Sequence, residues 1–205
     1  MDVVTATAGK RGRPRSEQAK RALLQATGEL LRDRDLPTIS ADDIARRAGV
    51  SKATIYRWWE SKSALALDAF LEELSRREGS VPDTGSLRGD LYASLRTRSR
   101  VLAANPWLGR TMAILVANTA SDPGLRETYL DHVVRPLRAQ ARVFFDRAIE
   151  RGEIRPDVNV DVALDLTYGA MYHRVFHGHA PLGDRFTKSV VDTVVTGIGA
   201  RTRRR

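Results

Sequence analysis

The sequence predicts an all-α protein of about nine helices, and three features of the chain support that prediction. Apolar residues recur at three- and four-residue intervals through most of the chain, which is the spacing of one face of a helix. Glycine and proline interrupt this pattern, most clearly between residues 79 and 89. The valine-rich segment 184–200 has the composition of a strand, but its valines keep helical spacing and the chain offers no partner strand.

Residues 40–59 have the pattern of a helix-turn-helix motif. Ser40 is a good N-cap, and two aspartates follow it in the first turn of the first helix. Gly49 can take the left-handed conformation that ends a helix without a steric penalty. Ser51 then caps a second short helix over residues 52–58. In proteins with this motif the second helix enters the major groove of DNA.

The side chains of the second helix suit contacts with DNA. Lys52 can neutralise a phosphate or donate to guanine, Thr54 can hydrogen-bond in either sense, and Arg57 can donate two N–H groups to guanine or phosphate. An ordinary surface hairpin is the alternative, but it leaves unexplained why Tyr56, Trp58 and Trp59 crowd beside these cations on so short a helix. The residues therefore favour DNA binding.

The run DDIARRAGVSKATIYRWWESKSAL closely resembles the DNA-binding domain of TetR-family (tetracycline-repressor-like) transcriptional regulators. The resemblance extends from about Ser16 to Leu74. It implies a three-helix N-terminal unit that carries the helix-turn-helix, and a fourth helix that links it to a C-terminal helical ligand-binding and dimerisation domain. It also implies a phosphate contact by Lys62. The candidate DNA-binding residues of this unit are Ser40, Ser51, Lys52, Ala53, Thr54, Tyr56, Arg57, Trp58 and Lys62.

The chain is expected to contain two domains between two basic ends. Residues 16–78 form the DNA-binding domain with its linking helix, and residues 79–200 form the effector-binding and dimerisation domain. Residues 1–15 form a disordered basic arm, because a charged segment without apolar residues at regular spacing cannot fold alone. Residues 201–205 form a basic tail.

The basic ends favour a polyanionic partner. Residues 10–15 and 201–205 carry four positive charges each, which together make eight of the chain's nine net charges. Arg11, Arg13 and Arg15 alternate with glycine and proline and are candidates for an arm that enters the DNA minor groove. The alternatives are a disordered leader that adds only non-specific affinity and, at the C-terminus, a solvated tail without a partner.

The composition argues against several other classes of protein. The chain has no cysteine, which rules out disulfides and thiol catalysis and fits a reducing cytoplasm. No apolar run reaches the roughly 18–20 residues that span a bilayer, and the first charges are not followed by the apolar segment of a secretion signal. Hydrolase, nucleotide and dinucleotide motifs are absent. We therefore expect a cytoplasmic, nucleoid-associated protein without membrane partners, without a cofactor and without enzymatic activity.

Five helices are expected in the second domain. Pro136 falls inside the apolar pattern of the third and should kink or split it. The last two contain small residues that permit close packing, and the resemblance implies that this pair forms a homodimer interface. The alternative is that they complete the core of the monomer. The five helices are expected at residues 86–104, 105–116, 125–151, 160–176 and 184–200.

Aromatic residues and methionines of the second domain are candidates for an effector pocket. At helical spacing such residues are more often part of an ordinary core. Only the family resemblance makes a pocket a better interpretation than their spacing alone would. The candidates are Trp107, Met112, Tyr129, Phe144, Phe145, Tyr168, Met171 and Tyr172.

Two further groups of side chains could suggest a metal site or acid–base catalysis. His173 and His177 share a helix face, but the helix should end before His179 and separate it from them, and no acidic or cysteine ligand completes the set. Asp161 and Asp165 lie one turn apart on an expected solvent edge. We therefore expect neither a metal site nor a catalytic carboxylate pair.

The predicted function is that of a homodimeric transcriptional repressor. Each protomer would place one recognition helix in the major groove of a near-palindromic double-stranded DNA operator, and a small-molecule effector of unknown identity would release the protein. The alternative is a non-specific or architectural DNA-binding protein that uses its basic arms. An enzyme fused to a DNA-binding unit is a more distant alternative, because no nucleophile and base are recognisable.

Overall fold

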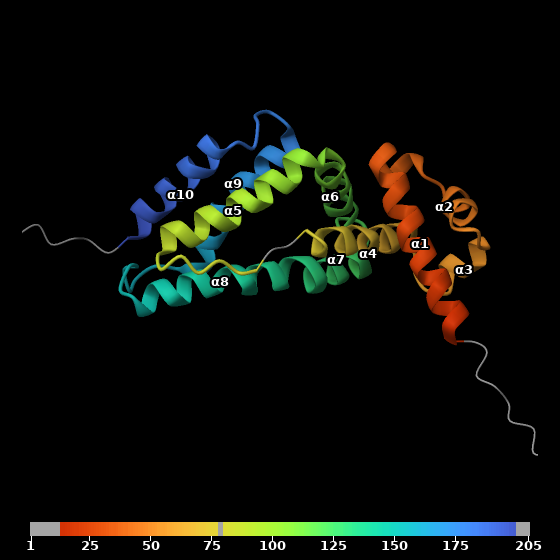
Figure 1. The fold of residues 1–205 in the computed structure, drawn as a ribbon, viewed down its shortest axis with the longest axis horizontal. Coiled ribbons are helices and arrows are strands. Elements are labelled where there is room, and N and C mark those ends of the chain that lie inside the picture. The colour runs from red at the N-terminus through yellow and green to blue at the C-terminus, as the bar shows by residue number, and fades with distance from the viewer. Residues whose placement is uncertain (1–12, 78–79, 200–205) are drawn as a thin grey trace, which may run out of the picture. The chain divides into compact units, whose positions relative to one another are not determined.

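The structure, a computed structural model, describes residues 13–77 and 80–199, and its regular elements are helices (Figure 1). Within these ranges there is no β-strand, only an isolated antiparallel bridge between Ile154 and Gly199. The all-α prediction is therefore confirmed. None of the described helices combines the length and apolar character that crossing a bilayer requires. The chain divides into two compact units, Met1–Glu72 and Glu73–Arg205.

The first unit has the succession of helices that the sequence predicts. α1 begins at Arg13, three residues before the expected start at Ser16, so that Arg15 also stands in its first turn. Pro14 suits this turn because a helix does not use the N–H groups of its first residues. The elements are α1 (Arg13–Asp33), the short 3-10 helix η1 (Leu36–Thr38), α2 (Ala41–Ala48), α3 (Lys52–Tyr56) and the larger part of α4 (Lys62–Ser75).

A small apolar core holds these helices together. Leu23 and Leu31 of α1, Ile44 of α2, Ile55 of α3 and Phe70 of α4 are each at most 2% exposed. Burying one such side chain stabilises a fold by about 1.5–3 kcal/mol. α2 packs against both α1 and α3. Because α3 has only five residues and is too short to be stable alone, Ile55 anchors it to the rest of the unit.

The second unit is a bundle of helices of 5 to 18 residues (Figure 1). α7, a π-helical segment η2 and α8 follow one another directly, and Pro136 stands in the first turn of α8. The predicted interruption at Pro136 is confirmed, since this residue lacks the N–H that would continue the α-helical pattern. Counted as one interrupted helix, these three give nine helices in the described ranges. The elements are α5 (Leu87–Ala104), α6 (Pro106–Asn118), α7 (Pro123–Tyr129), η2 (Leu130–Val134), α8 (Arg135–Glu150), α9 (Val160–His177) and α10 (Asp184–Ile198).

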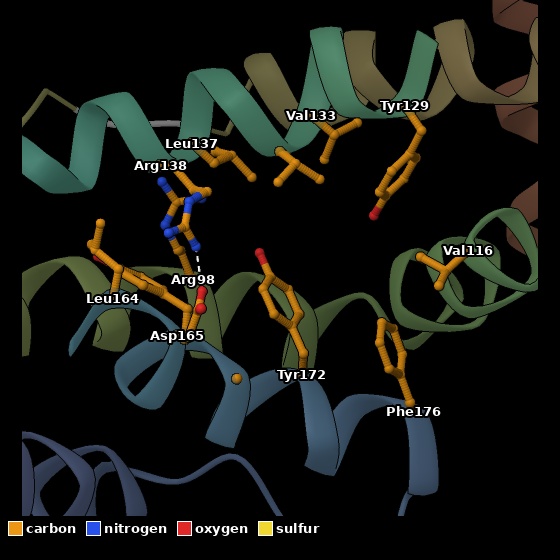
Figure 2. A pocket seen from close by; sticks show the side chains of 13 residues that line it. Arg98, Val116, Tyr129, Val133, Leu137, Arg138, Leu164, Asp165, Tyr172 and Phe176 are labelled. Atoms are coloured by element: carbon orange, nitrogen blue, oxygen red, sulfur yellow. Dashed lines mark hydrogen bonds and ion pairs between the residues drawn. The ribbon is translucent and has the colours of Figure 1, made fainter. Parts of the chain in front are cut away.

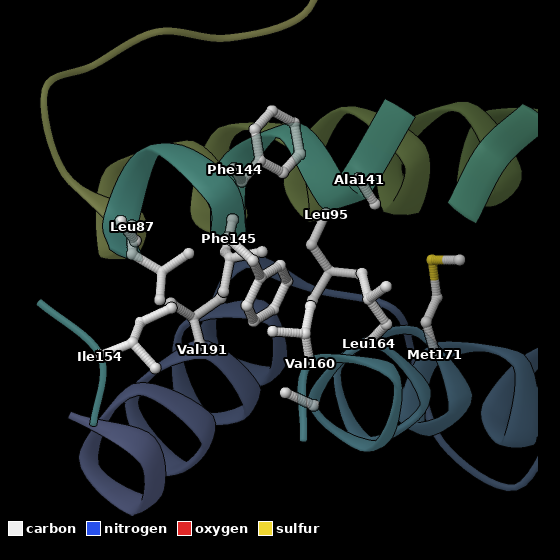
Figure 3. Close-up of a cluster of buried hydrophobic side chains, with 13 residues drawn as sticks. Leu87, Leu95, Ala141, Phe144, Phe145, Ile154, Val160, Leu164, Met171 and Val191 are labelled. Carbon is white, nitrogen blue, oxygen red and sulfur yellow. The ribbon is translucent and has the colours of Figure 1, made fainter. Parts of the chain in front are cut away.

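The main core of the second unit lies between α5, α8, α9 and α10 (Figure 3). Leu91 and Leu95 come from α5, Phe145 from α8, Leu164 from α9 and Val191 from α10, and each is at most 2% exposed. These contacts fix α8 and α9 relative to each other. Both helices also contribute side chains to a cavity that adjoins this core, since Leu164 belongs to both.

Candidate functional site

The turn between α2 and α3 is fixed by the caps that the sequence predicts. The Ser40 hydroxyl accepts a hydrogen bond from the Asp43 N–H, and the Asp43 carboxylate accepts one from the Ser40 N–H, each at 3.0 Å. The hydrogen bond from the Ser40 N–H is the largest of the causes that lower the pKa of Asp43 to about 2. Gly49 ends α2 with a φ of 67°, in the left-handed region. Both predicted caps are confirmed, and they set the direction in which α3 leaves the turn.

α3 presents an exposed face of polar and aromatic side chains. Lys52, Ala53 and Arg57 are exposed, and Tyr56 is 52% exposed. Ser51 stands at the N-cap position, as predicted, but its hydroxyl does not bond the helix backbone. It lies 2.9 Å from the hydroxyl of the half-buried Thr54 instead, and either oxygen can donate. The Thr54 hydroxyl therefore already has one partner in the unbound protein.

Lys52 is paired with an acidic residue of α2. Its Nζ lies 2.9 Å from Oδ2 of Asp42, and this hydrogen bond raises the pKa of Lys52. Both side chains are about half exposed or more, and such ion pairs contribute at most about 1 kcal/mol. The pair can therefore open at little cost when a phosphate or a base competes for the ammonium group.

Two cations lie near the ring of Trp58. The Nζ of Lys20 is 5.3 Å from the ring centroid, and the guanidinium carbon of Arg57 is 5.8 Å from it. Contacts of this kind contribute about 0.5–1 kcal/mol at exposed sites. Lys20 was not among the predicted DNA-binding residues, because it comes from α1 and nothing in its sequence position marks it. We use the term α3 surface for Lys20, Lys52, Thr54, Tyr56, Arg57 and Trp58.

Lys62 makes contacts that its position in the sequence does not reveal. Its Nζ donates to the carbonyl oxygen of Leu36 at 2.8 Å and to that of Ile39 at 2.5 Å. Partial burial lowers the pKa of Lys62. Two of the three ammonium N–H groups thus hold the start of α4 to the segment before α2. A phosphate contact by the third N–H stays a prediction.

The predicted arm lies mostly outside the described residues. Arg11 belongs to the part of the chain that the structure does not describe, as do the arginines of the tail at 201–205. Arg13 and Arg15 stand in the first turn of α1. Minor-groove contacts by these arginines stay a prediction.

The second unit contains a cavity of about 430 Å³ (Figure 2). Its walls come from α5, α6, α7, η2, α8 and α9, and they are mostly aliphatic and aromatic. This volume lies at the small end of the roughly 300–1,000 Å³ that is common for ligand pockets. The lining residues are Arg98, Val116, Tyr129, Val133, Val134, Leu137, Arg138, Leu164, Asp165, Tyr168, Gly169, Tyr172 and Phe176.

The eight residues predicted for an effector pocket separate into two groups. Tyr129, Tyr168 and Tyr172 line the cavity. The other five are buried elsewhere: Phe144, Phe145 and Met171 belong to the main core, and Trp107 and Met112 are buried in α6. The three that line the cavity are those with a hydroxyl group. Burying a hydroxyl group in a closely packed apolar core without a hydrogen-bond partner is costly, so such a group is expected beside a partner or an open space.

Charged side chains lie together along one part of the cavity wall (Figure 2). Arg138 donates to Asp165 and, at 3.0 Å, to Oδ1 of Asp161. Arg98 donates to the Gln140 side chain at 2.7 Å, and its guanidinium lies 5.9 Å from the Tyr168 ring centroid. Asp161 and Asp165 are exposed, as predicted, but Asp165 also contributes to the cavity wall.

Two of the cavity tyrosines differ in how their hydroxyl groups are satisfied. The Tyr168 hydroxyl lies 3.1 Å from the Ser94 hydroxyl. Tyr129 is only 8% exposed, and its hydroxyl makes no hydrogen bond within the described ranges. Figure 2 shows this hydroxyl directed into the cavity. Burial raises the pKa of both phenols, so both remain neutral at ordinary pH.

The histidines near the end of α9 lie closer together than the sequence predicts. Gly178 ends the helix in a left-handed conformation. The chain then turns back, so that the ring of His179 lies 5.1 Å from that of His173, which is itself 4.5 Å from that of His177. The expected separation of His179 was therefore wrong. Even so, no group of three or more His, Asp or Glu side chains in the described ranges has a geometry that could hold a metal ion.

Comparison with known protein families divides the chain in a similar way. Residues 23–69 match the family model described as bacterial regulatory proteins, tetR family. Residues 81–194 match the model described as the tetracyclin repressor-like C-terminal domain. The first match contains α2 and α3 with their turn, and the second contains every residue that lines the cavity.

Individual proteins resemble the chain over most of its length. The uncharacterized HTH-type transcriptional regulator YdeS of Bacillus subtilis is 34% identical over 93% of this chain and 95% of its own. The DNA-binding transcriptional repressor TetR of Mycobacteroides abscessus is 32% identical over 88% and 94%. The crystal structure of the TetR family transcription regulator SCO0332 superposes with a TM-score of 0.72 at 35% identity, over 88% of this chain and 98% of its own.

Proposed function

The chain belongs to the TetR family of DNA-binding transcriptional regulators, and from this premise we propose that it is a homodimeric repressor released from DNA by a small molecule. The observation that carries the proposal is that one chain combines an exposed α3 surface with a separate cavity large enough for a ligand. Such a protein needs no enzymatic activity and no cofactor. A chromosomal operator would place its work in the cytoplasm at the nucleoid.

The α3 surface would make the sequence-specific contacts. Lys52, Thr54 and Arg57 are placed to meet base edges, while Tyr56 and the basic arm would meet phosphates. Ser40 and Ser51, at the two N-caps, would lie close to the sugar–phosphate backbone of the DNA, because N–H groups at the start of a helix bind phosphate favourably. A dimer would place its two α3 helices about 34–36 Å apart, and its operator would be a near-palindrome.

The last two helices support the assignment of a homodimer. Val162 and Leu166 lie one turn apart on α9 and are 51% and 60% exposed. Gly169, which also lines the cavity, follows about one turn later, and a side chain there would meet nothing within 4 Å. Gly197 of α10 is equally open. A second copy packed on this face would bury both apolar side chains and could approach closely at the glycines.

The cavity would receive the effector. A ligand that binds better to one arrangement of the protein than to another shifts the population toward that arrangement. A difference of a few kcal/mol is enough to change DNA occupancy strongly. The B. subtilis FadR, solved in complex with stearoyl-CoA, shares this fold at 19% identity and TM-score 0.68, over 87% of this chain and 98% of its own. Its ligand does not identify the effector of this chain.

The test is binding of the full chain to duplex from its own upstream region and to scrambled duplex, across a salt series. We expect a strong preference for the upstream duplex at physiological salt, with two protomers per site. Arg57→Gln should reduce that preference, whereas Arg126→Gln, which removes an equal charge from an exposed position on α7, should not. Equal binding of both duplexes with a steep loss of affinity in salt would instead support a non-specific, architectural protein.

A further inference from the structure

We propose that the cavity takes an uncharged, compact, mainly apolar effector that carries a carbonyl-type oxygen, and that the Tyr129 hydroxyl donates a hydrogen bond to this oxygen. This inference rests on the proposed function, because it assigns the chemical class of the effector. It is carried by three properties of the cavity: its apolar walls, a Tyr129 hydroxyl without a hydrogen-bond partner in the described ranges, and two aspartates that neutralise Arg138.

The cavity walls favour an apolar ligand. Val133 and Leu164 are at most 4% exposed and belong to opposite sides of the cavity, on η2 and α9. Leu137, Val116 and Phe176 add further aliphatic and aromatic surface. Removing such surface from water by filling it with ligand is favourable in proportion to the area covered. A hydrophilic ligand would lose its hydration without compensation over most of this wall.

Tyr129 provides the polar contact. The side chain is more than nine-tenths buried, and its hydroxyl points into the cavity without a hydrogen-bond partner in the described part of the chain (Figure 2). A phenol that stays neutral is a better donor than acceptor, because its ring withdraws electron density from the oxygen. A ligand oxygen with free lone pairs is therefore its best complement. A site that holds such a hydroxyl discriminates against analogues that leave it unpaired.

The charged side chains argue against an ionised ligand. Arg138 is neutralised by Asp161 and Asp165, and Arg98 is held by Gln140 and the face of Tyr168. A charged group placed against the apolar wall, away from these side chains, would remain unpaired. An uncharged ligand leaves them all intact.

The direct test is calorimetric titration of the full chain, without DNA, with matched aromatic probes. Fluorenone, fluorene, fluorene carboxylate and aminomethylfluorene share one ring system and differ in the polar group. We expect fluorenone to bind roughly three- to tenfold more tightly than fluorene and both ions to bind more weakly than fluorenone. Benzophenone and diphenylmethane repeat the comparison with a different shape.

Two variants locate the hydrogen bond. In Tyr129→Phe the preference for ketone over hydrocarbon should disappear, while the affinity for fluorene stays the same. In Tyr168→Phe, whose hydroxyl is paired with Ser94, the preference should remain. If Tyr129→Phe fails to fold, the infrared carbonyl stretch of fluorenone bound to the unaltered protein answers the same question. It should lie at lower frequency than in an apolar solvent, because a donated hydrogen bond weakens the carbonyl bond.

The proposal is overturned if no ketone binds, if an ion binds most tightly, if the ketone preference survives in Tyr129→Phe, or if the carbonyl stretch of the bound ketone is unshifted. Failure of the proposed function gives a different result. Ketone binding that depends on Tyr129 but leaves the affinity for the upstream duplex unchanged would uphold the site and reject effector-driven release.

Discussion

The two units of the chain place their functional residues in opposite ways. Five of the six residues of the α3 surface fall between residues 52 and 58, in and just after one short helix whose start and direction are set by local caps. The cavity instead takes its thirteen lining residues from six elements between residues 98 and 176. A surface of the first kind can be found in the sequence, because neighbours along the chain are neighbours in space. A cavity of the second kind depends on packing over long distances.

The substitution with the largest expected effect on stability and DNA binding tests whether α3 depends on the core of the first unit. Ile55→Ala removes a fully buried side chain from a helix of five residues. We expect a loss of about 2–5 kcal/mol in the free energy of unfolding of this unit, and loss of specific DNA binding. Thermal unfolding and binding to the upstream duplex measure both. Ile149→Ala, at a position 51% exposed on α8, is the control and should change stability by less than about 0.5 kcal/mol.

A smaller effect separates two roles for Lys62. Lys62→Met leaves the carbonyl groups of Leu36 and Ile39 without their shared donor, which should cost about 1–3 kcal/mol of stability. Urea unfolding measures this loss. A phosphate contact would add a second result, a decrease of about one in the slope of log affinity against log salt. Unchanged stability together with a reduced slope would contradict the anchoring role.

Sequence preference should depend on Thr54. Thr54→Ala removes a hydroxyl and a methyl group from the α3 surface, and we expect it to change discrimination at one operator position by about 1–3 kcal/mol. Binding to a set of duplexes with single base changes measures this. Thr97→Ala, at an exposed position of α5, should leave the preference as it is. A uniform loss of affinity for all duplexes would instead indicate that Thr54 contacts the DNA backbone and not a base.

The smallest effect concerns acid stability of the cap. The pKa of Asp43 is lowered from 3.8 to about 2 by its bonds to Ser40, so its stabilising contribution is present above pH 3.8. It should be lost as the pH falls from 3.8 through 2. Asp43→Asn should remove this dependence, whereas Asp42→Asn, one residue earlier in the same turn, should retain it. Urea midpoints at several pH values in this range would show the difference.

The outcome of the sequence-based predictions follows the same division. Ser40 and Gly49 were assigned correctly because caps depend on a few adjacent residues. Helical spacing could show that Tyr129 and Phe145 face inward, but not that one meets a cavity and the other the core. The return of His179 toward His173 depends on the chain direction after Gly178, which periodicity does not describe.

The most direct test of the account is a hydroxyl-radical footprint of the full chain on its upstream duplex, combined with the mass of the complex. We expect two protomers and two protected patches on one face of the DNA, about 10–10.5 base pairs or a multiple of that apart. Both patches should disappear together in Ile55→Ala. A single protomer, or continuous protection without a fixed position, would contradict it.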